Sequence, residues 1–339
     1  MTRRAKRRAI ALTVVAAAIV YYQAATWLAW RAIDAQRPAI AGGTGPHYVD
    51  RDRLMADVTL LASSQMGGRR TGSPGGRKAR EWIASQFRDI GLTPAGSAEY
   101  LQPFSFTHLS IKRLVLPGPA ETPYTDGANV LGRIDGSAAG TQPIVISAHY
   151  DHLGTTDAGI FHGADDNASG MAALLAVARQ LRMSPLRHPT IIAAFDAEEL
   201  GLKGAEAFLE ARPDARAAVM NVNLDMVSRN DRNEIFAAGT YHYPQFKPML
   251  EDVRTRARVQ VLFGHDRPLH RSGGVDDWTR LSDHYVFHDA GVPFVYFGVE
   301  DHADYHTPTD TADKIDRRYY GDVVDMIIDA IRTFDARLP

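Results

Sequence analysis

Four short clusters of histidine and acidic side chains each follow an apolar run of this chain, at positions 149–152, 196–199, 225 and 301–306. Imidazole nitrogens and carboxylate oxygens bind divalent metal ions and exchange protons in acid–base catalysis. A single loop carboxylate is usually a solvated surface group. Several carboxylates in one cleft repel each other and lose their hydration, which is costly unless a cation compensates. The clusters therefore predict a metal site, and ligands without sulfur suit zinc or another divalent first-row metal.

A further polar segment, Gly163-Ala-Asp-Asp-Asn-Ala-Ser-Gly170, leads into a helical stretch of small and apolar residues. Taken alone, this segment could be an ordinary turn that caps a helix. Beside His149 and the Glu198–Glu199 pair it becomes another component of the same site.

The apolar runs belong to a chain in which strands and helices alternate. Continuous apolar runs such as 144–146 and 191–195 are typical of strands that helices cover on both faces. In open α/β sheets, ligands bind outside the carboxyl ends of the strands, where the polar clusters fall. We expect helices at 51–61, 76–90, 170–181 and 202–211, and strands at 100–106, 111–116, 128–134, 144–148, 190–195, 218–224 and 294–297. This order predicts an α/β fold, a single-domain three-layer α/β/α sandwich with a mixed, mostly parallel central sheet.

The uncharged run 9–30 is as long as the ~20 residues that a helix needs to cross a bilayer. Five basic residues precede it, and such flanks stay in the cytoplasm, so the body is expected outside. We expect a cytoplasmic segment at 1–8, a transmembrane signal anchor at 9–30, a linker at 31–50 with a flexible stalk at 35–47, and the folded domain at 51–339. This arrangement predicts a single-pass protein of the inner membrane with a periplasmic body. The alternative is export after cleavage of a signal peptide.

Composition narrows the chemistry further. The chain has no cysteine, which excludes disulfides, thiolate ligands and a cysteine nucleophile. Its net charge is -2. Residues 1–37 are net positive, and the remainder of the chain is net negative. A mildly acidic body gives no support to a nucleic-acid partner, which calls for a clustered basic face.

Five motifs, in this order, resemble those of the M28 family of zinc aminopeptidases. They are Ala148-His-Tyr-Asp-His152, the 163–170 segment, Ala197-Glu-Glu-Leu-Gly201, Leu224-Asp-Met226 and Tyr305-His-Thr-Pro308. The resemblance runs from about position 51 to the C-terminus and includes Gly68-Arg-Arg-Thr-Gly-Ser73. It implies a zinc peptidase domain that removes residues from peptides with a free N-terminus.

Carried over residue by residue, the resemblance implies that Asp166 bridges two zinc ions. Glu199 and His306 would complete one site, and His149 and Asp225 the other. The same resemblance implies a cis peptide bond between Asp166 and Asn167.

The resemblance also implies the remaining roles. Asp151 would be the carboxylate behind His149 that fixes its tautomer. Glu198 would be the general base, and Tyr305 either stabilises the developing oxyanion or only packs beside His306.

Other residues stay without a metal-binding role. His152 and His302 are expected near the ligands or at the surface, and Asp310 is expected to hydrogen-bond locally around Pro308. The role of Ser282-Asp-His284 does not follow from the sequence.

Three rival functions use related folds. A glutaminyl cyclase would work with a single zinc ion, and a non-catalytic binding protein would lack a ligand or the base, although none is missing here. A carboxypeptidase or deacylase with an inserted dimerisation domain needs more room than the chain offers between Asp225 and His306. The preferred N-terminal residue, the physiological substrate and the oligomeric state cannot be read from the sequence, because the loops at about 228–285 would line the pocket.

Overall fold

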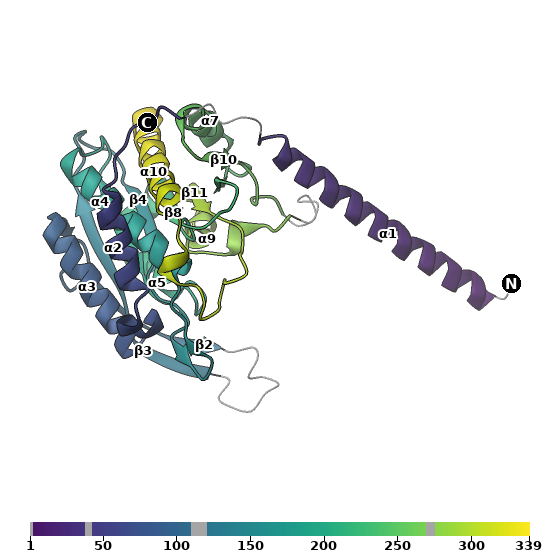
Figure 1. Cartoon of the computed structure of the whole chain (residues 1–339), viewed down its shortest axis with the longest axis horizontal. Helices are drawn as coiled ribbons and strands as arrows, with labels where there is room; N and C mark the ends of the chain where they lie inside the picture. The colour runs from purple at the N-terminus through teal and green to yellow at the C-terminus, as the bar shows by residue number, and fades with distance from the viewer. Residues whose placement is uncertain (1–2, 38–42, 110–120, 269–274) are drawn as a thin grey trace.

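A mixed sheet of nine strands forms the centre of the body in the computed structural model, which describes residues 3–37, 43–109, 121–268 and 275–339 (Figure 1). The strands are β1 (Thr93–Pro94), β2 (Leu101–Leu109), β3 (Glu121–Ile134), β4 (Ile144–His149), β7 (Thr190–Phe195), β8 (Met220–Leu224), β9 (Glu234–Ala238), β10 (Gln260–Leu262) and β11 (Phe294–Gly298).

The four central strands, β7, β4, β8 and β11, run parallel to one another. On one side β3 joins β7 in antiparallel register, and on the other side β9 joins β11 in the same manner. Every residue of the central strands is buried, because helices cover both faces of the sheet. The parallel centre places four carboxyl ends at one edge of the sheet.

Helices form the outer two layers. One layer holds α2 (Arg51–Leu61), α3 (Pro74–Ile90), α4 (Gly170–Met183), α7 (Lys247–Arg256) and α10 (Arg317–Arg337), which share the larger apolar core. The other holds α5 (Lys203–Ala211), α6 (Pro213–Arg216) and α9 (His284–Asp289) over a smaller core. Asp50 caps α2 by accepting the Asp52 and Arg53 N–H groups, and Gly91, at φ 82°, ends α3. The predicted three-layer α/β/α fold is therefore confirmed.

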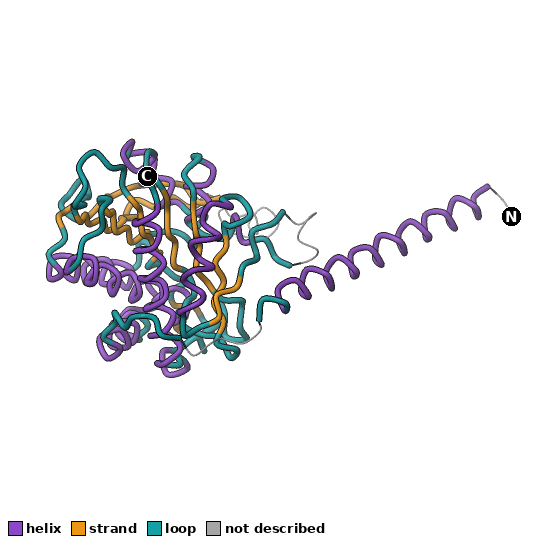
Figure 2. The backbone as a smooth tube through the Cα atoms, turned by 90° about the horizontal axis from the view of Figure 1, so that it is seen from above, coloured by secondary structure: helices purple, strands orange, loops and turns teal. Residues whose placement is uncertain are grey.

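The N-terminal helix α1 (Arg3–Asp34) projects away from the body (Figures 1 and 2). Within the described chain, only α1 is long and apolar enough to cross a membrane, over the 23 residues Leu12–Asp34. Gln36 and Arg37, which the sequence places in a flexible linker, are hydrogen-bonded to the body instead. That part of the prediction is wrong, and the predicted strand 111–116 lies outside the described residues.

Candidate metal centre

The predicted site residues come together at the carboxyl edge of the parallel strands. His149 is the last residue of β4, and Glu198 and Glu199 follow β7. Asp225 follows β8, and His306 lies in the loop after β11. Asp166 lies at a kink, with non-helical backbone angles, in the short segment η3 (Ala164–Ser169) that leads into α4. The peptide bond between Asp166 and Asn167 is cis, which confirms that prediction.

The two carboxylate oxygens of Asp166 face two separate groups of side chains. Asp166 Oδ2 is 2.9 Å from His306 Nε2, which in turn is 3.5 Å from Glu199 Oε1. Asp166 Oδ1 is 3.4 Å from His149 Nε2, which is 3.3 Å from Asp225 Oδ1. A carboxylate placed in this way can bridge two cations, one on each side.

The donor atoms fit divalent metal ions. They form two sets whose atoms lie within 4.8 Å of one another, His152, Asp166, Glu199 and His306 in one and His149, Glu198 and Asp225 in the other. Burial lowers the pKa of His306, but hydrogen bonds to Asp166 and Glu199 outweigh this and raise it to about 10. A metal ion would replace the proton that these carboxylates favour. All five predicted ligands belong to the two sets.

His152 belongs to the first set and not to the surface. Its side chain is buried, and its Nδ1 is 2.8 Å from Glu199 Oε1 and 3.6 Å from Asp166 Oδ2. Among the described residues, its Nε2 has no hydrogen-bond partner. In the sequence, only the position of His152 three residues after His149 indicated that it lies near the metal ligands.

Asp151 contacts both His149, at the end of β4, and the loop after β7. The His149 Nδ1 is 3.2 Å from the Asp151 carbonyl oxygen and 3.6 Å from its carboxylate, so the carbonyl is the closer acceptor. An Nδ1–H bond of this kind leaves Nε2 free to bind a metal ion. The Asp151 carboxylate accepts the N–H groups of Glu198 and Glu199, at 3.0 and 3.3 Å.

Glu198 faces the cavity from the loop after β7. Burial raises its pKa well above the usual range for glutamate, although the nearby His149 acts in the opposite direction. Ala197, Met226 and His306 have φ values of 58°, 59° and 52°, in the left-handed region that favours glycine. Such strained backbone is concentrated at functional sites, where the surrounding structure holds it.

A cavity of about 640 Å³ opens in front of these side chains. Tyr305 lines it and stacks on His306 with ring centroids 3.9 Å apart. Apolar side chains of Leu202, Met226, Leu281 and Val286 form part of its wall. The residues at about 228–285 contribute Arg280, Leu281 and Tyr285 to this cavity, as the sequence predicted in part.

Arg69 is a fully buried residue of the site, and the sequence predicted no role for it although it lies in the 68–73 segment of the resemblance. Its guanidinium group donates hydrogen bonds of 2.7–3.5 Å to five backbone carbonyl groups, those of Leu61, Tyr150, His162, Gly163 and Asp166. Burial lowers its pKa to about 10, against the charges of the surrounding acidic residues. Arg69 thus links the loop that follows His149 to the loop that carries Asp166.

Asp310 also holds the loop of Asp166. Its carboxylate accepts the Asp165 N–H at 3.0 Å and the Asp166 N–H at 3.2 Å. The prediction of side-chain hydrogen bonds confined to the Pro308 turn is wrong, because the side chain turns toward a loop more than a hundred residues away in sequence.

The other unassigned residues have structural contacts. His302 Nε2 is 3.2 Å from Asp165 Oδ2. Ser282 Oγ accepts a hydrogen bond from the Asn223 amide, and His284 Nε2 donates to the Trp278 carbonyl. The Asp283 carboxylate is buried and has no hydrogen-bond partner in the described part of the chain.

Comparison with known proteins adds independent findings. A sequence model described as Peptidase family M28 matches residues 129–331, more than half of the chain. Aminopeptidase YwaD of Bacillus subtilis (strain 168) is 29% identical over 201 residues. That alignment covers 56% of this chain and only 40% of the relative.

Two solved structures share the fold. The aminopeptidase from Aneurinibacillus sp. strain AM-1 has a TM-score of 0.65 at 17% identity, covering 84% of this chain and 93% of its own. The Bacteroides thetaiotaomicron glutaminyl cyclase bound to N-acetylhistamine also has a TM-score of 0.65 at 17% identity, covering 85% and 99%. At such identities the likeness concerns the fold alone.

Proposed function

Because this chain belongs to peptidase family M28, we propose that it is an aminopeptidase that binds two zinc ions and releases the N-terminal residue of peptides. The position of Asp166 between two groups of ligands carries this proposal. Asp166 would bridge the ions, with Glu199 and His306 holding one and His149 and Asp225 the other. Zinc, when bound, supplies a water of lowered pKa and a Lewis acid for the carbonyl group.

Glu198 is the proposed general base. Its carboxylate takes a proton from the attacking water, while the water oxygen bonds to the scissile carbonyl carbon. As the C–N bond breaks, Glu198 passes this proton to the leaving amine nitrogen. Burial raises the pKa of Tyr305 above its usual range, so its hydroxyl stays protonated and can donate a hydrogen bond to the carbonyl oxygen.

The cavity wall suggests the substrate. Leu202, Met226 and Leu281 offer an apolar surface beside the ligands. We therefore propose peptides with a free N-terminus and an apolar first residue as substrates.

The membrane topology is part of the proposal. Residues 1–8 would lie in the cytoplasm, 9–30 would cross the inner membrane, and 31–50 would link the span to a periplasmic domain, 51–339. The long apolar α1 supports this arrangement, and the five basic residues in its first turns favour an orientation with that end in the cytoplasm.

Metal content tests the proposal directly. We expect full-length protein in detergent to carry two zinc ions per chain by elemental analysis and to release free amino acids from a panel of dipeptides. Dialysis against a chelator should abolish this release, and added zinc should restore it. One zinc ion per chain, with ring closure of N-terminal glutamine and no hydrolysis, would make the protein a cyclase instead.

Replacing Asp310 by asparagine should weaken zinc binding by about 10- to 100-fold, because residues that orient metal ligands commonly contribute this much. The uncharged amide oxygen accepts weaker hydrogen bonds from the Asp165 and Asp166 N–H groups than the carboxylate does, and the amide NH2 group accepts none. Competition with a chromophoric chelator measures the change. Asp313→Asn, which removes the same charge from an exposed position nearby, is the matched control. Equal zinc affinity in both variants would show that Asp310 does not position Asp166.

A further inference from the structure

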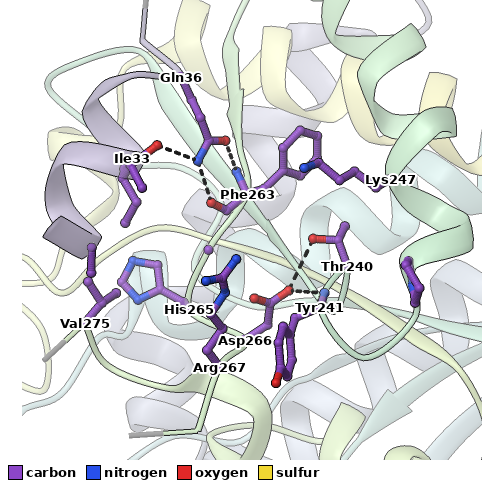
Figure 3. Close-up of a pocket in the computed structure, with 14 residues that line it drawn as sticks. Ile33, Gln36, Thr240, Tyr241, Lys247, Phe263, His265, Asp266, Arg267 and Val275 are labelled. Atoms are coloured by element: carbon purple, nitrogen blue, oxygen red, sulfur yellow. Dashed lines mark hydrogen bonds between the residues drawn. The ribbon is translucent and has the colours of Figure 1, made fainter. Parts of the chain in front are cut away.

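A second cavity, of about 360 Å³, lies between the end of α1 and the part of the body around β9 and β10 (Figure 3). Ala29, Ile33 and Gln36 line one side, and Lys247, Phe263 and Arg267 line the other. None of its lining residues lines the cavity of the metal centre. It is therefore a separate site.

The end of α1 is firmly attached to the body. The Ile33 side chain is buried in an apolar cluster of the body. The Gln36 side-chain amide donates to the Phe263 carbonyl at 2.9 Å and accepts the Phe263 N–H at 2.9 Å (Figure 3). Arg37 makes two hydrogen bonds to the Glu234 carboxylate, at 2.7 and 3.1 Å. These contacts fix both walls of the cavity relative to each other.

The cavity lies where the outer surface of the membrane is expected, a step that rests on the proposed topology. Trp27 and Trp30 stand at the end of the 9–30 run, and tryptophan is enriched at the membrane–water interface. The cavity starts at Ala29 and continues through Ala32. Because a helix rises about 1.5 Å per residue, these positions lie within a few ångströms of the lipid headgroups.

The far wall carries exposed positive charge. Lys247 and Arg267 are both exposed and lie over aromatic rings, with Lys247 Nζ 5.6 Å from the Phe263 centroid and Arg267 Cζ 5.5 Å from that of Tyr241. Within the described residues, the only ion pair of Lys247 is an exposed one at 4.0 Å with Glu251, and Arg267 makes none.

The acidic residue of the cavity does not neutralise this charge. Asp266 is buried, and its carboxylate already accepts the N–H groups of Gly239 and Tyr241, at 3.0 and 2.8 Å, and lies 3.3 Å from the Thr240 hydroxyl. Two basic side chains therefore remain available beside apolar walls formed by Ile33 and Phe263.

From this combination we propose that the cavity binds an anionic phospholipid of the outer leaflet. Lys247 and Arg267 contact its phosphate group, since both side chains bind phosphate oxygens well. Ile33 and Phe263 contact the glycerol and the first acyl carbons. The bound lipid would hold the body at a fixed position above the membrane.

Native mass spectrometry of the full-length protein in detergent tests this site. Phosphatidylglycerol and phosphatidylcholine with the same acyl chains are titrated separately. We expect one phosphatidylglycerol per chain, bound more tightly than phosphatidylcholine. The Lys247→Gln/Arg267→Gln variant should bind it on the order of 30-fold more weakly, as the loss of two basic side chains at an anionic surface predicts. Lys78→Gln/Arg318→Gln, which removes the same charges from exposed positions on α3 and α10, should bind like wild type.

Four outcomes would overturn the proposal. Unchanged binding in the cavity variant, or an equal loss in the control variant, would exclude a specific site. Displacement of the lipid by millimolar inorganic phosphate would show a simple anion site. An intact mass that places the mature N-terminus after Gln36 would remove one wall of the cavity.

The same samples separate this proposal from the enzymatic one. The Lys247 and Arg267 substitutions lie outside the metal centre, so peptide hydrolysis should stay at the wild-type rate. Lipid binding without any hydrolysis would contradict the proposed aminopeptidase and leave the lipid site standing. Hydrolysis without selective lipid binding would contradict the lipid site and leave the proposed aminopeptidase standing.

Discussion

Replacement of Glu198 by glutamine should lower the rate of N-terminal residue release by about 10³-fold, while the zinc content stays unchanged. Glutamine has nearly the same size and fills the same space in the cavity. Its amide cannot take a proton from water at neutral pH, so proton transfer to the leaving amine is lost. Turnover of an apolar dipeptide, measured together with zinc per chain, checks both parts of the prediction.

Glu206→Gln provides the control, because Glu206 lines the same cavity but is exposed and paired with Lys203. Its hydrolysis rate should stay within a few-fold of wild type. A Glu198→Gln variant that keeps full activity would exclude Glu198 as the base. Loss of zinc together with activity would instead make Glu198 a ligand, a role that its position within 4.8 Å of the His149 and Asp225 donor atoms allows.

The fold could be predicted where the signal is local. The buried strands β4 and β7 contain the apolar runs 144–146 and 191–195 of the sequence, and α2 has the predicted bounds. β9 and β10 were not predicted, since each has at most five residues and lies in a region that we expected to be loops. Short strands acquire their identity from the neighbours they pair with, and those neighbours are distant in sequence.

In the site, too, the residues marked by a local pattern could be predicted and those held by long-range contacts could not. His149, Asp225 and the Glu198–Glu199 pair follow apolar strands directly, so the parallel sheet alone brings them to one edge. The contacts of Arg69 and Asp310 cross about 90 and 145 positions of sequence. No periodicity marks such contacts, because they depend on how the loops fold over the strand ends.

Arg69→Met should destabilise the protein by on the order of 3–5 kcal/mol, the second large effect we expect. Methionine fills much of the same space but donates no hydrogen bonds. The carbonyl groups of Tyr150, Gly163 and three other residues would lose their partner in a buried setting, where each unpaired group is costly. Arg70→Met is the matched control, since the neighbouring Arg70 is exposed and should be replaceable at little cost.

Arg69→Lys separates charge from hydrogen bonding. The guanidinium group opposes the negative charge of Asp166, Asp310 and the other carboxylates of the site, so part of its effect is electrostatic. Lysine keeps the charge but has three donors on one nitrogen and cannot span two loops. We expect its thermal unfolding temperature in detergent to lie between those of wild type and Arg69→Met, and its zinc affinity to fall with the loss of loop order. If all three proteins unfold together, the loops that carry His149 and Asp166 do not depend on Arg69.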